Sequence, residues 1–122
     1  MGCTNAGKSE IAGLAGNTGS CTAFTALAYG TGSTAFAATQ TALVTESQRA
    51  AAVVTRTTTT VSNDTLQLSK TFTASTTETV KEVGIFNNAT SAGTMLCRTV
   101  LGTPRSLTSG DTYTATYKVA FA

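Results

Sequence analysis

The sequence predicts a mainly β protein: an antiparallel β-sandwich or small barrel with a short N-terminal helix and a long loop rich in glycine, alanine and threonine. Threonine supplies 28 of the 122 residues, and its β-branched side chain suits a pleated, half-exposed surface. Apolar and polar residues also alternate with period two through the C-terminal two thirds, as in strands with one wet face. A chain of this length forms a single domain with a substantial core.

The first part of that domain, residues 1–20, is expected to be a helical arm. Thr4 is a suitable cap for a short helix over about residues 5–14. This helix would turn Ile11 and Leu14 toward the core.

The same arm contains a sequence that fits the phosphate-binding pattern G-x-x-x-x-G-K-[ST] at residues 2–9. A functional phosphate loop follows a buried strand, and its Mg²⁺ is held with the help of an acidic residue that ends an apolar strand. Only Met1 precedes the motif, and Asp64 and Asp111 both lie in turn sequences. We therefore favour the helix cap over nucleotide binding.

The second part, residues 21–49, is expected to be a strand followed by an extended loop. The apolar run from Phe24 to Tyr29 predicts the strand, and small residues dominate the loop that follows, residues 30–46. Loops of this length often bind a partner. Phe36 is an aromatic residue among small ones in this loop, and it is either an interface anchor or part of the core.

The third part, residues 50–122, is expected to form the antiparallel sandwich core, with strands separated by turn sequences. The first two strands would form a hairpin through Ser62-Asn63-Asp64, and Gly102-Thr103-Pro104 would end the fourth strand. The expected strands are residues 51–61, 66–72, 81–86, 94–101 and 112–121. The last of them carries its apolar face on Tyr113, Ala115, Tyr117, Val119 and Phe121.

Charge and hydropathy exclude several classes of partner. Only 11% of residues are charged and the net charge is +2, with lysine and arginine occurring singly, so we expect no nucleic acid partner. No apolar stretch approaches the length of a membrane span, and the N-terminus lacks the layout of a signal peptide. We expect a protein made in the cytoplasm of its host, without contact to a membrane.

The three cysteines do not predict a metal site. They have no C-x-x-C spacing, and the chain contains no histidine to act as a further ligand. We expect them to fill space as small apolar residues. A Cys3–Cys21 disulfide, or an intermolecular disulfide through the N-terminal region, is the alternative.

The sequence offers no catalytic residues and no cofactor site. Histidine, the commonest acid–base group, is absent, and no G-x-S-x-G motif is present. Of the six carboxylates, only Glu46 and Glu82 lie near apolar segments. We expect Glu82 to be partly buried in a structural ion pair with Arg49 or Arg98.

Four blocks of the chain resemble a family of small tailed-bacteriophage virion proteins, which include tail-fibre, tail-collar and head-decoration proteins. Thr4-Asn5-Ala6-Gly7-Lys8 is similar to the family's opening T-N-A-G-K helix, and residues 24–32 to its strand and glycine turn. Thr41-Ala42-Leu43 through Glu46 and Arg49 resembles T-A-L-x-x-E-x-x-R. The stretches 82–87 and 95–100 resemble E-V-G-L-F-N and the L-L-A-R strand.

This resemblance implies a β-sandwich structural protein of the virion, without enzymatic activity. Fibre relatives continue into a shaft, whereas this chain stops at Ala122. We therefore expect a capsid decoration (cement) protein that binds and stabilises the assembled head. A tail component (fibre, collar or adaptor module) is the alternative. A carbohydrate-binding sandwich ranks last, because tryptophan is absent and the aromatic residues of the last strand are expected in the core.

The expected partners are the major capsid protein or tail proteins, together with further copies of the chain in a dimer or trimer. We expect the contact surfaces to be the N-terminal segment, residues 1–14, and the loop from residue 31 to 46. The candidate contact residues are Lys8, Ile11, Phe36, Leu43 and Glu46.

Overall fold

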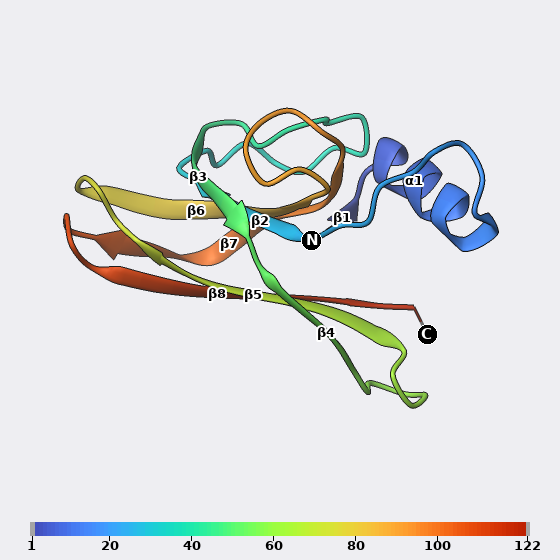
Figure 1. Ribbon diagram of the computed structural model, residues 1–122. Coiled ribbons are helices and arrows are strands. Elements are labelled where there is room, and N and C mark those ends of the chain that lie inside the picture. Colours follow the sequence, from blue (N-terminus) through green and yellow to red (C-terminus); the bar gives the residue numbers. More distant parts are fainter. Residues whose placement is uncertain (1, 122) are drawn as a thin grey trace.

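The computed structural model describes residues 2–121 and contains two antiparallel sheets packed face to face (Figure 1). One sheet has five strands in the order β1-β7-β6-β2-β3, and the other has three in the order β4-β5-β8. The fold is therefore mainly β and sandwich-like, and it is not a closed barrel, which settles the choice between the two predicted architectures. The elements are β1 (Gly2–Cys3), α1 (Asn5–Gly16), β2 (Ala26–Gly30), β3 (Glu46–Ala51), β4 (Val53–Thr57), β5 (Thr65–Thr73), β6 (Glu78–Phe86), β7 (Met95–Leu107) and β8 (Thr112–Ala120).

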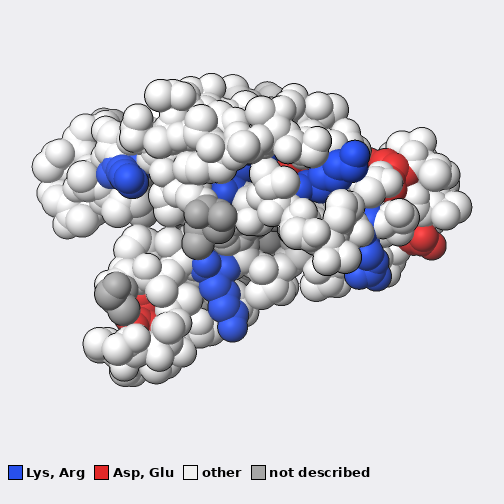
Figure 2. Space-filling view, turned by 180° about the vertical axis from the view of Figure 1, so that it is seen from behind, with Lys and Arg blue, Asp and Glu red and all other residues white. Residues whose placement is uncertain are grey.

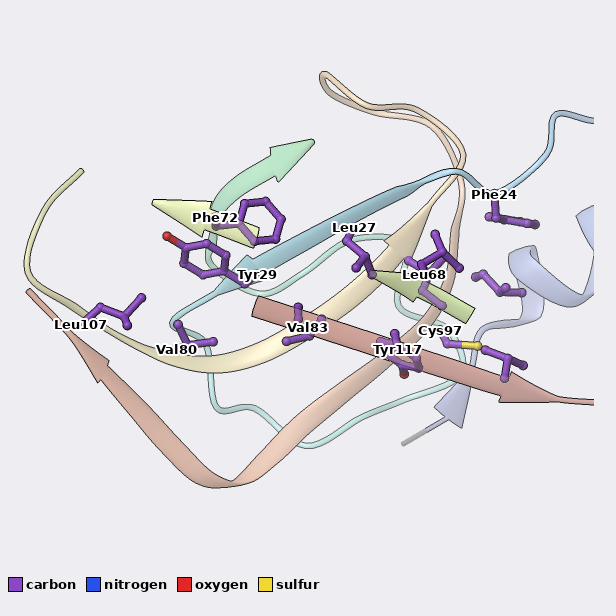
Figure 3. Close-up of a cluster of buried hydrophobic side chains, with 14 of the residues drawn as sticks. Phe24, Leu27, Tyr29, Leu68, Phe72, Val80, Val83, Cys97, Leu107 and Tyr117 are labelled. Carbon is purple, nitrogen blue, oxygen red and sulfur yellow. The ribbon is translucent and has the colours of Figure 1, made fainter. Parts of the chain in front are cut away.

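The main core lies between the two sheets (Figure 3). Tyr29 of β2 stands near its centre, with its ring edge-on to the rings of Phe72 and Tyr113 at centroid distances of 5.0 and 5.9 Å. The predicted period-two alternation holds in β5 and β8, where Leu68, Phe72, Ala115, Tyr117 and Val119 are buried. Phe121 departs from the predicted face, because it follows β8 and is 57% exposed.

A second, smaller apolar cluster lies on the opposite face of the five-stranded sheet. It contains Ala26 and Ala28 of β2, Phe86 of β6, Met95 of β7 and Leu43 of the long loop. Two loops, residues 31–45 and 87–94, cover this face of the sheet (Figure 1). The long loop is thus a third layer of the fold rather than a free extension.

The predicted strand over residues 51–61 corresponds to β4 alone, and β3, which lies almost entirely before that range, was not predicted. β3 pairs with β2 in the five-stranded sheet, and after Ala52 the chain continues as β4, which pairs with β5 in the other sheet. The backbone N–H of Ala52 still donates to the Thr25 carbonyl at 2.8 Å. The predicted hairpin with the following strand is confirmed, but β4 ends at Thr57 and a turn occupies residues 58–64.

The prediction that Gly102-Thr103-Pro104 ends a strand is wrong, because β7 continues to Leu107. The partner register jumps from Glu82 opposite Val100 to Val80 opposite Arg105. Four residues of β7 therefore bulge opposite Lys81 alone. Proline, which has no N–H to donate, is tolerated where the ladder is interrupted in this way.

The cysteine predictions are also wrong. Cys3 of β1 and Cys97 of β7 face each other across the antiparallel pair and form a disulfide, while Cys21 is a free, half-buried thiol. No local pattern pairs residues that are 94 positions apart. The sheet register brings them together, and the bond joins the N-terminal arm to β7 of the five-stranded sheet.

We expect the double substitution of Cys3 and Cys97 by alanine to lower the free energy of unfolding by roughly 4 kcal/mol, since closing so long a loop restricts the unfolded chain most. Urea unfolding of the oxidised protein and of the variant measures the difference. Cys21→Ser is the matched control and should unfold like the parent. Equal stabilities of the double variant and the parent would contradict this assignment.

Candidate functional site

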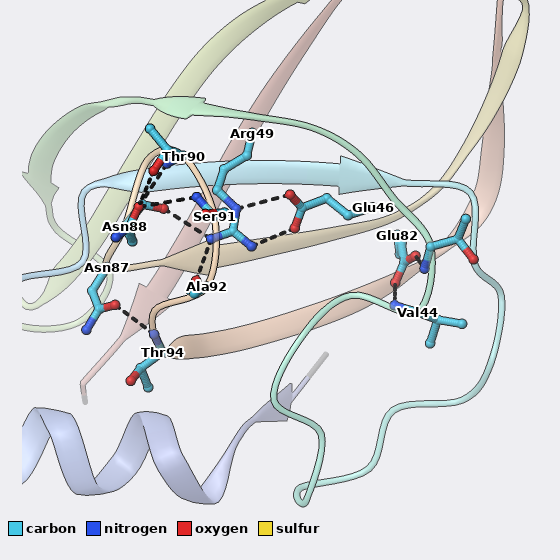
Figure 4. A network of polar contacts seen from close by, with 11 residues as sticks. Val44, Glu46, Arg49, Glu82, Asn87, Asn88, Thr90, Ser91, Ala92 and Thr94 are labelled. Carbon is cyan, nitrogen blue, oxygen red and sulfur yellow. Dashed lines mark hydrogen bonds and ion pairs between the residues drawn. The ribbon is translucent and has the colours of Figure 1, made fainter.

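A buried ion pair fixes the long loop on the five-stranded sheet. The Glu82 carboxylate accepts hydrogen bonds from the backbone N–H groups of Gly32, Val44 and Thr45 at 3.0, 2.9 and 2.8 Å, so it joins both ends of the loop. Figure 4 shows the contact with Val44. The Arg98 Nε donates to the same carboxylate at 2.7 Å, and both side chains are fully buried.

Arg98 holds the middle of the same loop. Its Nη1 donates to the Thr34 carbonyl at 2.8 Å and to Gln40 Oε1 at 3.4 Å. Its Nη2 is buried without a partner among residues 2–121. One guanidinium and one carboxylate therefore bind five residues of the loop, which explains how a segment without regular structure can cover a sheet.

Burial by itself raises the pKa of the Glu82 carboxyl, but the hydrogen bonds from the loop amides and from Arg98 outweigh it. The net effect is a pKa below the ordinary value for glutamate. Asp64 has a lowered pKa for a related reason, because its carboxylate accepts from the backbone N–H groups of Val61, Thr59 and Thr60.

Arg49 forms a second polar centre, separate from Glu82. Its Nη2 lies 2.7 Å from the Glu46 carboxylate, and its Nη1 donates to the carbonyls of Asn88 and Ala92 at 3.2 and 2.6 Å (Figure 4). The guanidinium also lies 3.7 Å from the centre of the Phe86 ring, a cation–π geometry. Of the two partners expected for Glu82, Arg98 is thus the one present, and Arg49 instead anchors the loop of residues 87–94.

The five predicted contact residues do not form one surface. Lys8 is exposed on α1 and Ile11 is half-buried against the main core. Leu43 is 7% exposed and belongs to the second apolar cluster, so it cannot reach a partner in this conformation. Glu46 is exposed, but its carboxylate is engaged by Arg49.

Phe36, the fifth of these residues, has an intramolecular partner. Its ring packs against Gly2 so closely that no side chain could be added there. The residue is half-buried and holds the loop on β1. Of the two roles expected for it, this position favours the packing role over a free anchor.

The residues that match the phosphate-loop pattern begin α1 and pack it against β7. Thr4 caps α1: its Oγ1 accepts from the Gly7 N–H at 2.8 Å, and the Thr4 hydroxyl donates to the Met95 carbonyl. The Asn5 N–H donates to Ala38 O at 2.9 Å. A Cβ on Gly7 would lie 2.6 Å from the Leu96 carbonyl oxygen, so the second motif glycine allows the helix to pack on β7. The amides that would cradle a phosphate are partnered within the chain.

Two clefts lie at the open sides of the sandwich. A cleft of about 390 Å³ lies between β7 and β8, with Thr99, Leu101, Tyr113 and Tyr117 among its lining residues. The Tyr117 hydroxyl is buried without a partner among the described residues, and burial raises its pKa. The second cleft, about 340 Å³, lies between α1 and the β4–β5 hairpin and is mostly apolar.

Within residues 2–121 there is no group of three or more histidine, cysteine, aspartate or glutamate side chains placed to hold a metal ion. No helix in that range is long and apolar enough to cross a membrane. Comparison of the chain with models of protein families, with curated proteins and with solved structures finds no match.

An exposed group of apolar residues around the β4–β5 hairpin was not predicted from the sequence. These are Val53, Val54, Val61 and Phe121. The adjacent valines were a signal, because neighbouring strand residues point to opposite faces and only one of them can enter a core.

We expect Glu82→Gln to lower the free energy of unfolding by about 3 kcal/mol or more, because it leaves the Arg98 charge buried without a counter-ion. Glu46→Gln is the matched control: it removes the carboxylate of the partly exposed pair and should cost less than about 1 kcal/mol. Urea unfolding at neutral pH measures both. Equal losses would refute the structural role given to Glu82.

The lowered pKa of Glu82 also predicts a pH dependence. A carboxyl whose folded pKa lies below its unfolded value, about 4.3 for glutamate, adds stability above that value and loses it as the pH falls toward the folded pKa. We expect the free energy of unfolding to fall more steeply between about pH 5 and 3 in the parent than in Glu82→Gln. Urea titrations across this range test the difference, and parallel curves would count against it.

Proposed function

We propose that this protein is a structural component of a tailed-bacteriophage virion, without enzymatic activity, and that it binds the assembled head as a decoration protein. The proposal starts from the four sequence blocks that resemble such proteins. In the structure all four blocks are joined to one another through the Glu82 carboxylate, Arg98 and the Thr4 hydroxyl, and this is the observation that carries the proposal.

The contacts between blocks connect residues that the resemblance alone would leave unrelated. Glu82 of the E-V-G-L-F-N-like block pairs with Arg98 of the L-L-A-R-like strand, and the Thr4 hydroxyl of the opening block donates to Met95 at the start of that strand. Glu46 and Arg49 pair within the T-A-L-x-x-E-x-x-R-like block. A set of motifs that together build one loop-covered sheet supports a shared architecture better than scattered matches do.

The surface suits a protein that binds many equivalent sites. Charged side chains are few and scattered on the face shown in Figure 2. Threonine hydroxyls line the outward faces of β5 and β8. The Oγ1 atoms of Thr71 and Thr114 form a hydrogen bond of 2.9 Å across the two strands. Such a surface makes many weak contacts, and a repeating lattice multiplies a modest affinity per site.

The copy number of this protein in purified virions tests the proposal. We expect a ratio to the major capsid protein near one, or a simple fraction of it, by quantitative mass spectrometry. About ten copies per particle would instead favour a fibre, collar or adaptor of the tail. Particles that contain none of the protein would refute the virion assignment and reopen carbohydrate binding.

Removing the protein from the phage and adding purified protein back is a second test of the proposal. Phage that lack the protein should release DNA at a lower temperature, and purified protein should restore the parent value by binding the heads. The Cys21→Ser variant, which changes only a free thiol outside the expected contact surfaces, is a folded control that should restore it equally well. Restoration by unrelated protein at the same concentration would argue against specific binding.

A further inference from the structure

β4 is a free edge strand. It is the terminal strand of the three-stranded sheet, with β5 on one side and no strand among the described residues on the other. Val53 is 69% exposed, and Val54, Thr55 and Arg56 are exposed as well. Proteins usually block such edges with proline, bulges or inward charges, because free N–H and C=O groups accept another strand. β4 has no proline and no bulge against β5, and Arg56 is its one inward charge.

Exposed apolar side chains lie on this strand and at the turn end of its hairpin. Val53, Val54, Val61 and Phe121, which we name the hairpin patch, are four of the five large apolar residues that are exposed among residues 2–121. A hydrogen bond of 3.0 Å from the Phe121 N–H to the Asp64 carbonyl holds Phe121 at the hairpin. Single exposed apolar residues are ordinary, whereas a group beside a free edge marks an interaction site.

The cleft between α1 and the hairpin lies on the inward side of the same edge. Val54 and Arg56 are opposite Leu68 and Leu66 of β5, so their side chains point to the inward face, where both line the cleft. The space-filling view shows the hollow between the helical lobe and the projecting hairpin (Figure 2). A strand added beyond β4 would direct alternate side chains to the mouth of this cleft.

We propose that β4 pairs with β4 of a second copy of the chain, antiparallel and about a two-fold axis at Thr55, to form one continuous six-stranded sheet. The charges of the strand allow this self-pairing. Val53 would face Thr57 of the second copy, and Val54 would face Arg56, so no like charges are directly opposed. The two copies of Arg56 would be diagonal neighbours on the inward face, where Asp64 also lines the cleft as an opposite charge. Arg56 is the only charged residue of the strand, and its aliphatic stem can cover the opposing valine.

The size of the contact predicts a weak dimer. Five residues of paired strand, with Val53 and Val54 on its two faces, form a smaller interface than the roughly 1,600 Å² of a standard stable complex. We expect a dissociation constant on the order of 10–100 µM, and therefore an equilibrium that depends on concentration. The inference stands independently of the virion proposal, because its test uses the purified protein alone.

Sedimentation velocity over about 1 µM to 1 mM tests the dimer. The parent should shift from monomer to dimer, and Val53→Lys should remain monomeric with unchanged circular dichroism and melting temperature, because an edge lysine opposes strand addition. Thr103→Lys, which adds the same charge on the exposed bulge of β7, is the matched control and should dimerise like the parent. A parent that stays monomeric throughout, or a dimer that Val53→Lys leaves intact, would overturn the proposal.

A cysteine at the proposed axis tests the geometry without disturbing the edge. In a Cys21→Ser background, Thr55→Cys should be joined to a dimer by a short bis-maleimide, since the two copies of residue 55 would be opposite each other. Thr103→Cys in the same background should remain monomeric at that concentration. Equal cross-linking of the two variants would overturn the assignment of the axis. Loss of head binding by Val53→Lys, with a parent that is monomeric alone, would assign the edge to a strand of another protein and equally overturn self-pairing.

Discussion

The carboxylate of Glu82 is the contact on which the third layer of this protein depends. The long loop has no regular structure of its own, so its backbone amides need acceptors, and three of them are met by this single side chain. Arg98 balances the charge and extends the network to the middle of the loop. With the loop in place, Leu43 closes the second apolar cluster over Phe86 and Met95. The conformation of the loop and the packing of the sheet beneath it are therefore linked.

Each of the two ion pairs holds a different loop on the outer face of the five-stranded sheet. Glu82 and Arg98 are fully buried and hold the loop of residues 31–45, whereas Arg49 and the partly exposed Glu46 hold the loop of residues 87–94. Pairing of both charges is what makes their burial tolerable, because a single buried charge is costly. Only 11% of the residues are charged, and the four in these two pairs hold loops on the sheet.

Local pattern predicted the strands because period-two alternation acts within a few residues, and β5 and β8 follow it closely. The Thr4 cap was predictable for the same reason. Features set by distant parts of the chain were not. The Cys3–Cys97 bond depends on the register of β1 with β7, and the path of β7 through Gly102-Thr103-Pro104 depends on its pairing with β6. For the site, an ion pair between Glu82 and an arginine could be predicted. The choice of Arg98 over Arg49 depends on the pairing of β6 with β7. The hairpin patch was hidden because exposure is a property of the assembled sheets.

The Cys3–Cys97 bond also determines how the molecule carries mechanical load. A pull between the chain ends passes through the bond from β1 directly into the start of β7, so residues between the two cysteines are bypassed. Only the stretch after Cys97 can be drawn out, and at about 3.5 Å per residue its extension is limited to roughly 80–90 Å. The long loop, β6 and the β4–β5 hairpin lie within the covalent ring. Tension would detach β8 and the part of β7 beyond Cys97 while the polypeptide ring remains closed.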